Sequence, residues 1–248
     1  GLMSATLRRV WAQTWFETLA VLRNGEQLLL TMLLPAIALV ILTTSDLVPL
    51  PEPRPAAALG SALAMAVASS FTSQAIAVAF DRRWGVLRML ATTPLGPRGL
   101  LAGKLGAVLL VIVVQTALLT VLAAVLGWRA AGLGPAQVGG LAALAVVGGA
   151  VFVAFALLLG GTLRPEAVLA IANLLFVVIV MGAGLVLPLD MLPDAVAAVL
   201  AYLPPGALGE AMRALLTEGS VDLGALGVLA LWAAVGSLLA TRAFRWDA

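Results

Sequence analysis

The chain has 248 residues, of which 62% are hydrophobic and only 10% are charged. Soluble domains average roughly 45–50% apolar and about 25% charged residues, so this chain lacks the polar side chains that a solvated surface requires. Disorder is excluded as well, because disordered segments combine low hydrophobicity with high charge. The composition therefore predicts a protein whose solvent is a lipid bilayer.

The missing residue types exclude several kinds of chemistry. The sequence contains no Cys and no His, so we exclude disulfides, thiol nucleophiles, zinc sites and histidine acid–base catalysis. A formal net charge of +2 gives no support for nucleic-acid binding. We expect no catalytic residue, metal or cofactor in this chain. Residues 1–27 also lack the pattern of a signal peptide.

Residues 4–23 predict an amphipathic helix ahead of the first membrane span. Leu7, Trp11 and Trp15 recur at helical spacing, while charged residues such as Arg8 fall mostly elsewhere. Trp and Arg together favour the headgroup region, so we expect this helix to lie along the inner membrane surface. The alternative is a plain cytoplasmic extension of the first span.

Six stretches are long and apolar enough to cross a membrane as helices, which takes about 20 residues. Ionisable residues are almost absent from them, and Lys104 lies at the mouth of the third. Continuous apolar runs of this length oppose the alternating pattern of a membrane β-barrel. The sequence thus predicts an all-α polytopic protein with one transmembrane domain over residues 1–248. The predicted spans are residues 28–45, 56–80, 100–126, 135–161, 167–188 and 223–243.

The positions of Lys and Arg predict that both termini lie in the cytoplasm, because basic loops favour the inner side of the membrane. With this orientation, only Arg54, Arg129 and Arg213 of the 14 basic residues lie outside. The opposite orientation places nearly all of the positive charge outside. The inner basic residues are Arg8, Arg9, Arg23, Arg82, Arg83, Arg88, Arg98, Lys104, Arg164, Arg242 and Arg245.

The cytoplasmic segment 81–98 combines arginines with apolar residues. Trp84, Leu87 and Leu90 predict a short helix that offers an apolar surface to a partner, with arginines around it. A loop that only had to be solvated would not need these apolar residues. The alternative, which the composition supports equally, is a positively charged anchor beside an interfacial helix.

Residues 189–222 predict two short helices separated by a pair of prolines. The first helix begins at Pro193, because Pro favours the first position of a helix, and the second covers residues 206–216. Neither is long enough to span the membrane. We expect half-inserted helices that cap the outer face and pack on protein or line a cavity. The alternative is a loop that rests on the outer surface.

Uncharged polar residues inside the spans are candidates for contact with a transported molecule. An amphiphilic molecule favours apolar walls with a few polar groups. The alternative for each polar residue is a hydrogen bond between packed helices. The candidate translocation surface consists of Phe71, Gln74, Gln115, Asn173 and Phe176.

The order of these features resembles the membrane subunits of ABC exporters of the type-2 permease family, which move drugs, antibiotics and polysaccharides. Arg83-Trp-Gly-Val-Leu-Arg-Met-Leu-Ala-Thr-Thr-Pro-Leu95, followed by a Gly-Lys pair at 103–104, is similar to a family pattern. That pattern is Gly-Thr-Leu-(basic)-x-Leu-x-x-(Ser/Thr)-Pro. Val86 stands where the family usually has Thr, and Arg82 with Arg83 stands where acidic residues are common.

The resemblance implies which residues meet the partners. The segment after the second span would be a coupling helix docked on an ATP-binding subunit, which holds the ATP and Mg²⁺. A second permease chain, identical or homologous, and membrane lipid complete the expected partners. The implied coupling helix is Arg83, Trp84, Gly85, Val86, Leu87, Arg88, Met89 and Leu90. The outer gate is Leu192, Pro193, Leu203, Pro204 and Pro205, in a stretch that with Arg213 is similar to the family's outer re-entrant segment.

The function implied by the resemblance is ATP-driven export of a hydrophobic or amphiphilic compound (drug, antibiotic, lipid or glycan) across a bacterial plasma membrane. The chain itself is not expected to be an enzyme. A phosphate loop needs Gly where Arg98 stands and Ser or Thr where Leu105 stands, so Lys104 does not complete one. One alternative is a non-transporting membrane scaffold that docks a cytoplasmic partner. Another is an ion-coupled secondary transporter, which would normally carry ionisable residues within its spans.

Overall fold

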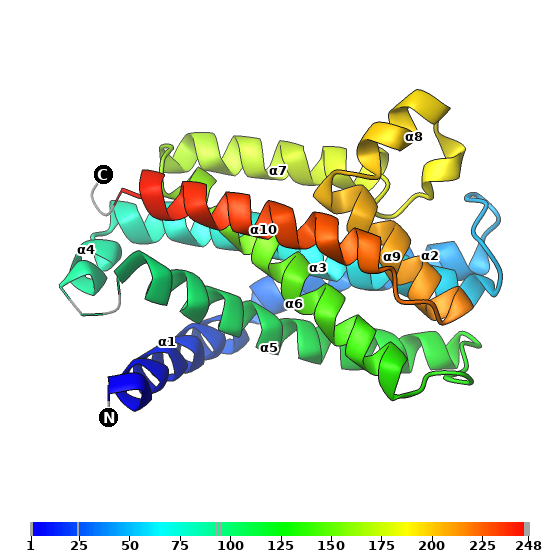
Figure 1. Ribbon diagram of the computed structural model, residues 1–248, viewed down its shortest axis with the longest axis horizontal. Helices are drawn as coiled ribbons and strands as arrows, with labels where there is room; N and C mark the ends of the chain where they lie inside the picture. The colour runs from blue at the N-terminus through cyan, green and yellow to red at the C-terminus, as the bar shows by residue number, and fades with distance from the viewer. Residues whose placement is uncertain (1, 24, 93, 95, 246–248) are drawn as a thin grey trace.

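The computed structural model describes residues 2–23, 25–92, 94 and 96–245, without the side chains of residues 2–4, 21–22, 26–30, 91 and 97. These residues form helices and connecting loops, without strands, and the long helices run side by side (Figure 1). The long helices are α1 (Leu2–Arg23), α2 (Gly25–Thr44), α3 (Arg54–Arg83), α5 (Gly96–Val125), α6 (Pro135–Gly160), α7 (Pro165–Gly182), α9 (Pro204–Glu218) and α10 (Leu223–Ala243). The short ones are α4 (Val86–Ala91), the 3₁₀ turn η1 (Leu189–Met191) and α8 (Asp194–Leu200).

The bundle has two distinct ends. The start of α1, all of α4 and the end of α10 lie together at the left of Figure 1, and we call this the α4 end. The loops that follow α2, α5 and α9 lie at the opposite end, which we call the loop end. Residues 93 and 95 of the predicted coupling segment lie outside the described residues.

Five helices in the described part of the chain are long and apolar enough to cross a membrane, namely α3, α5, α6, α7 and α10. Helices α8 and α9 meet the same criterion only as a pair, bent by 92°, just before the last span. This confirms an all-helical polytopic membrane protein with a bent helical pair before the last span. The predicted first span coincides with α2. The part of α2 whose side chains are described, Thr31–Thr44, is apolar but shorter than the five spanning helices.

Prolines set the start of several helices. Pro135, Pro165 and Pro204 each occupy the first position of a helix, where the missing N–H has no partner to lose. Helix α10 begins differently, because the Asp222 carboxylate accepts a hydrogen bond from the Ala225 N–H at 2.9 Å. These signals are local, and they place the turns of the bundle independently of its packing.

Helix α3 forms the centre of the molecule. Its residues 56–68 are all buried, and eight of these thirteen are Ala or Gly, so neighbouring helices approach it closely. A Cβ added to Gly60 would lie 2.9 Å from the backbone N and Cα of Arg213 in α9. Gly160 of α6 approaches α3 in the same way, at the carbonyl of Ala75. Small residues therefore set the distances between the central helices.

The outer helices turn large apolar side chains away from the bundle. Val121 of α5, Leu174 of α7 and Leu231 of α10 are each more than 60% exposed. Helix α7 is the least buried of the five spanning helices. In water such faces would mark an interface, whereas in a bilayer lipid tails or another helix cover them.

Candidate functional site

A tight turn joins α4 to α3 at the α4 end. Trp84 caps the end of α3, and Gly85 reverses the chain with a φ of +76°, a left-handed conformation that residues with a Cβ rarely adopt. Trp84 is then 71% exposed and Met89 is 65% exposed, and Arg83 and Arg88 are exposed beside them. We call these four side chains the docking surface, after the role that the sequence predicts for this segment.

The prediction that Leu87 belongs to this exposed surface is wrong. Its side chain is fully buried, and Leu90 is partly buried against the same hydrophobic core. Residues three apart share one face of a helix, so both leucines turn inward while Arg88 and Met89 turn outward. Leu87 therefore anchors α4 to the bundle, and the surface open to a partner is smaller than the sequence predicted.

Two arginines tie the end of α3 to the loop between α6 and α7. Arg82 is buried and donates hydrogen bonds to the carbonyls of Gly161, at 2.6 Å, and of Leu163. Arg83 forms an ion pair with Glu166 in the first turn of α7. The two basic residues that depart from the family pattern thus connect α3 to the start of α7.

A second polar cluster joins α1, α3 and α5 at the same end. The Lys104 ammonium of α5 lies 2.9 Å from both carboxylate oxygens of Glu17 in α1, and 4.0 Å from the carboxylate of Asp81 in α3. Lys104 is 1% exposed. The Thr14 hydroxyl also donates to the Gly103 carbonyl, at 3.3 Å. The sequence placed Lys104 at the mouth of the third span and gave no sign of this ion pair.

The five residues predicted to form a translocation surface do not lie together. Gln74 and Gln115 line one small slot between α2, α3 and α5, with a volume of about 30 Å³. Phe71 lines a different cavity, bounded by α6, α7 and α10. Asn173 is exposed on α7, where its amide donates to the Leu169 carbonyl of its own helix, and Phe176 packs against the core.

The slot is sized for a single water molecule rather than for a transported compound. The Gln115 amide donates to the Thr31 carbonyl at 3.3 Å, which joins α5 to α2. The Gln74 side-chain oxygen is buried without a partner among the described residues. Three serines complete the slot: Ser69, Ser70 and Ser73.

The outer segment forms the predicted pair of helices with shifted boundaries. Helix α8 begins at Asp194, one residue after the predicted start, and Pro193 caps it. The second helix begins at Pro204, two residues before the predicted start. The Pro204–Pro205 pair therefore forms the first turn of α9 instead of a separate break before it. Helix α8 has no buried residue, whereas most of α9 is buried. Of the predicted gate residues, Leu192, Leu203 and Pro204 are half-buried and Pro205 is buried, but Pro193 is exposed.

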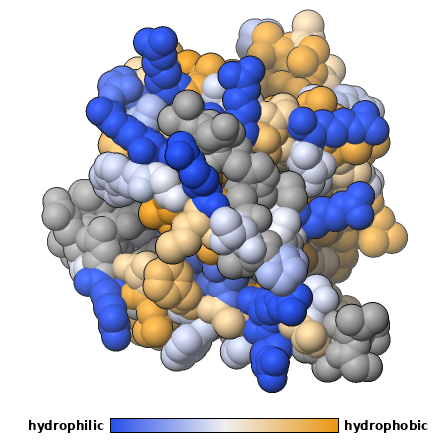
Figure 2. Space-filling model, turned by 90° about the vertical axis from the view of Figure 1, so that its left-hand side faces the viewer, coloured by the Kyte–Doolittle hydropathy of each residue, from blue (hydrophilic) through white to orange (hydrophobic). Residues whose placement is uncertain are grey.

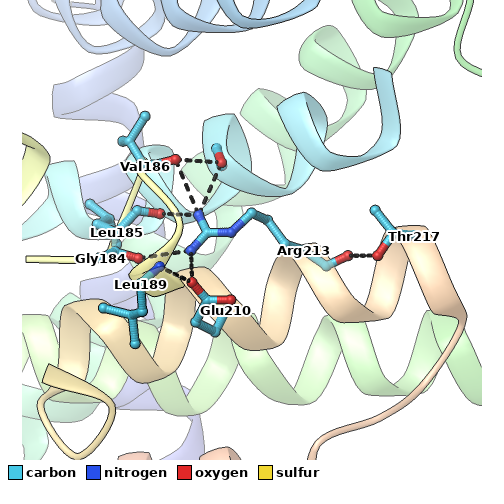
Figure 3. A network of polar contacts seen from close by, with 8 residues as sticks. Gly184, Leu185, Val186, Leu189, Glu210, Arg213 and Thr217 are labelled. Atoms are coloured by element: carbon cyan, nitrogen blue, oxygen red, sulfur yellow. Dashed lines mark hydrogen bonds and ion pairs between the residues drawn. The ribbon is translucent and has the colours of Figure 1, made fainter. Parts of the chain in front are cut away.

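Arg213 holds this outer segment to the bundle. The residue is 1% exposed, and its guanidinium donates to the carbonyls of Gly184 and Leu185, both at 2.9 Å, in the turn that follows α7 (Figure 3). It also pairs with Glu210 at 2.6 Å, and the Glu210 carboxylate in turn accepts the Leu189 N–H at 2.8 Å. One side chain therefore fixes α9, the turn after α7 and η1 relative to each other.

A second contact of the same guanidinium reaches α3. Arg213 donates to the Ser61 hydroxyl at 3.1 Å, and that hydroxyl donates to the Val186 carbonyl at 2.9 Å. The arrangement satisfies a turn whose carbonyls would otherwise be unpaired at membrane depth. The sequence signal for this role is a single Arg, three residues after Glu210, in the mostly apolar helix that follows a proline pair.

One family model covers the residues at both ends of the bundle. The model of the ABC-2 family transporter proteins matches residues 45–242, from the loop after α2 to the last turn of α10. The chain belongs to the ABC-2 transporter family. It is accordingly a multi-pass permease subunit of an ABC transporter, a membrane component without an ATP site of its own. No curated protein matches the chain.

Proposed function

We propose that this ABC-2 permease is the membrane subunit of an ATP-driven exporter, and that its docking surface binds a separate ATP-binding subunit. The observation that carries the proposal is the exposure of Trp84 and Met89 at the tip of the α4 end. Figure 2 shows this end, where strongly hydrophilic side chains surround patches of apolar ones. Exposed aromatic and Met side chains with Arg beside them are typical of protein interfaces.

The orientation that suits this proposal has the α4 end in the cytoplasm of a bacterium, with its plasma membrane around the bundle. The exposed arginines Arg83, Arg88, Arg98 and Arg164 belong to this end, in agreement with the excess of basic residues in cytoplasmic loops. ATP and Mg²⁺ would then bind to the partner at the same side of the membrane, within reach of α4.

Contacts of α4 offer a route for the motion of a docked subunit. Leu87 anchors α4 to the core, and Arg82 and Arg83 connect the end of α3 to the start of α7. Displacement of α4 would therefore move α3 and α7 together. Arg213 links the far ends of the same two helices to α9, so the outer segment would follow.

The exposed face of α7 supports a second permease chain, identical or homologous, as the partner within the membrane. This helix presents Leu174, Val177 and Met181 outward, all more than half exposed, with Asn173 among them. A polar side chain on a membrane-facing surface favours contact with another helix over contact with lipid. Two chains related by a twofold axis would form the passage between them.

The cargo proposed for this passage is a hydrophobic or amphiphilic compound, moved outward. The walls of the passage would be apolar side chains of α7 with few polar groups, which suits such a molecule. A scaffold that only docks a partner would hold the ATP-binding subunit without a cargo-dependent change in its ATP hydrolysis. An ion-coupled transporter would move its cargo without ATP hydrolysis at all.

The experiment replaces exposed residues of the docking surface. We expect Trp84→Ala with Met89→Asp to weaken binding of the ATP-binding subunit, measured by copurification, by about 30-fold or more, because loss of central anchors typically weakens an interface by 2 kcal/mol or more. ATP hydrolysis and export should fall in parallel. Leu47→Asp, which changes a 79% exposed residue at the loop end, is the matched control. Normal copurification and export by the double variant would contradict the proposal.

A further inference from the structure

A long apolar groove runs along the side of the bundle, apart from the docking surface and from α7's outward face. Its volume is about 440 Å³. Helix α6 forms the floor, α7 and α10 form the walls, and the first turn of α9 closes one end. Thr162 is the sole residue with a polar side chain other than Trp232 among those that line it, and its hydroxyl donates to the Leu158 carbonyl. The lining includes Phe71, Phe155, Leu159, Leu175, Ile179 and Trp232.

Water is a poor occupant of this groove. A buried water needs two to four polar partners, and the Trp232 indole N–H already donates to the Tyr202 carbonyl at 2.8 Å. The groove lies between two helices whose outer faces are apolar and exposed, so lipid tails surround its opening. An acyl chain fills such a space at no desolvation cost, and the geometry therefore points to lipid.

The length of the groove fits one leaflet. Its floor extends from Val151 to Leu159 along α6, which is about 12 Å at 1.5 Å per residue, and continues to Thr162 and Leu163 in the loop that follows. The hydrocarbon core of a bilayer is about 30 Å thick, so each leaflet contributes about 15 Å. The groove therefore extends from the α4 end over roughly the depth of one leaflet, which is the length of one acyl chain. At the far end Pro204 and Pro205 of α9 close it.

Basic residues gather where the groove reaches the α4 end. Arg164 directly follows the lining residue Leu163, and Arg242 lies in the last turn of α10. Arg245 comes next along the chain, with its N–H bonded to the Gly161 carbonyl at 3.1 Å. Glu166, two residues after Arg164, is already paired with Arg83. The charge at this mouth suits an anionic phosphate group.

We propose that the groove between α7 and α10 binds one acyl chain of an anionic phospholipid from the leaflet at the α4 end, with its phosphate held by Arg164 and Arg242. The lipid is a resident ligand of the fold, and not the transported cargo. It fills the space between α7, which packs mainly on α3, and α10, which packs mainly on α6, and so it holds α7 at its distance from α10.

The test measures lipid retained by the intact purified chain in native mass spectrometry, after delipidation and supply of phosphatidylglycerol or phosphatidylcholine. We expect one phosphatidylglycerol to be retained under conditions that remove phosphatidylcholine. Ile179→Trp fills the groove and should lower retention by about tenfold. Leu231→Trp is the matched control, because Leu231 neighbours Trp232 but does not line the groove and is 66% exposed.

A second pair of variants tests the headgroup. Arg164→Gln should reduce the preference for phosphatidylglycerol over phosphatidylcholine, whereas Arg129→Gln at the loop end should leave it unchanged. Equal retention by the Ile179 and Leu231 variants, or of the two lipids, would overturn the proposal. So would release of the lipid during ATP hydrolysis in the reconstituted transporter, which would make it cargo. Retention needs no ATP-binding subunit, so its failure is distinct from failure of the docking proposal.

Discussion

Arg213 is a charged side chain that membrane burial makes both costly and informative. Its guanidinium donates to three backbone carbonyls, a hydroxyl and the Glu210 carboxylate, in a geometry that uses its planar fork. A lysine keeps the charge but offers one nitrogen, which cannot reach these acceptors together. Removing one partner of a buried pair generally costs about 3–5 kcal/mol.

We expect Arg213→Lys to lower the free energy of unfolding by about 3 kcal/mol, because several charge-assisted hydrogen bonds are lost at once. Thermal unfolding of the purified chain in detergent measures the effect. Arg129→Lys is the control, since Arg129 is exposed at the loop end, and it should change stability by less than about 0.5 kcal/mol. An equal melting temperature for the two variants would show that the hydrogen bonds of the Arg213 guanidinium do not contribute to the free energy of unfolding.

Several residue-scale assignments could not be predicted from the sequence, for a geometric reason. Phe71 and Gln74 are three residues apart on α3, which suggests one shared face, yet they line different cavities on two sides of a helix that packs against several others. Leu87 is another case, because its burial depends on how α4 folds back after Gly85. Periodicity does not identify an outward face when neighbours surround the helix.

At the scale of elements, the long helices and the re-entrant pair were predictable because bilayer thickness sets the length of an apolar helix. The distances between helices were not, since they depend on single small residues. Gly60 lets α9 approach α3 so closely that a Cβ would meet the backbone of Arg213. Gly139 of α6, in contrast, has nothing within 4 Å of the position that a Cβ would occupy.

The two glycines form a matched pair for substitution to Ala. In an isolated helix, Ala is favoured over Gly by about 1 kcal/mol. We expect Gly139→Ala to be neutral or stabilising, whereas Gly60→Ala should lower the free energy of unfolding by about 1–3 kcal/mol, because α9 must shift. Thermal unfolding compares them. Similar shifts for both would mean that the α3–α9 distance is adjustable.

The contact of α1 with α5 depends on charge. Lys104→Met removes the cation that lies between Glu17 and Asp81, and leaves two carboxylates in a poorly solvated site. We expect a loss of about 3 kcal/mol and faster hydrogen exchange in α1, with part of the stability recovered by adding Glu17→Gln. Arg98→Met removes an exposed charge from the same helix and is the control. Unchanged exchange in α1 would rule out this ion pair as its anchor.

At the scale of the whole molecule, the outward face of α7 is the surface on which the proposed second chain depends. Phe71 and Gln74 are each 6% exposed, so neither reaches a neighbouring chain, and the test belongs on α7.

The native sequence has no Cys, which makes single introduced cysteines unambiguous. We expect Cys at Val177 or Met181 to crosslink two chains in native membranes under mild oxidation. Cys at Leu118, 52% exposed on α5, is the control and should not crosslink. Absence of crosslinks along α7, with active transport retained, would place the passage elsewhere. If the second permease chain is homologous rather than identical, the same positions should instead crosslink to a chain of different mass.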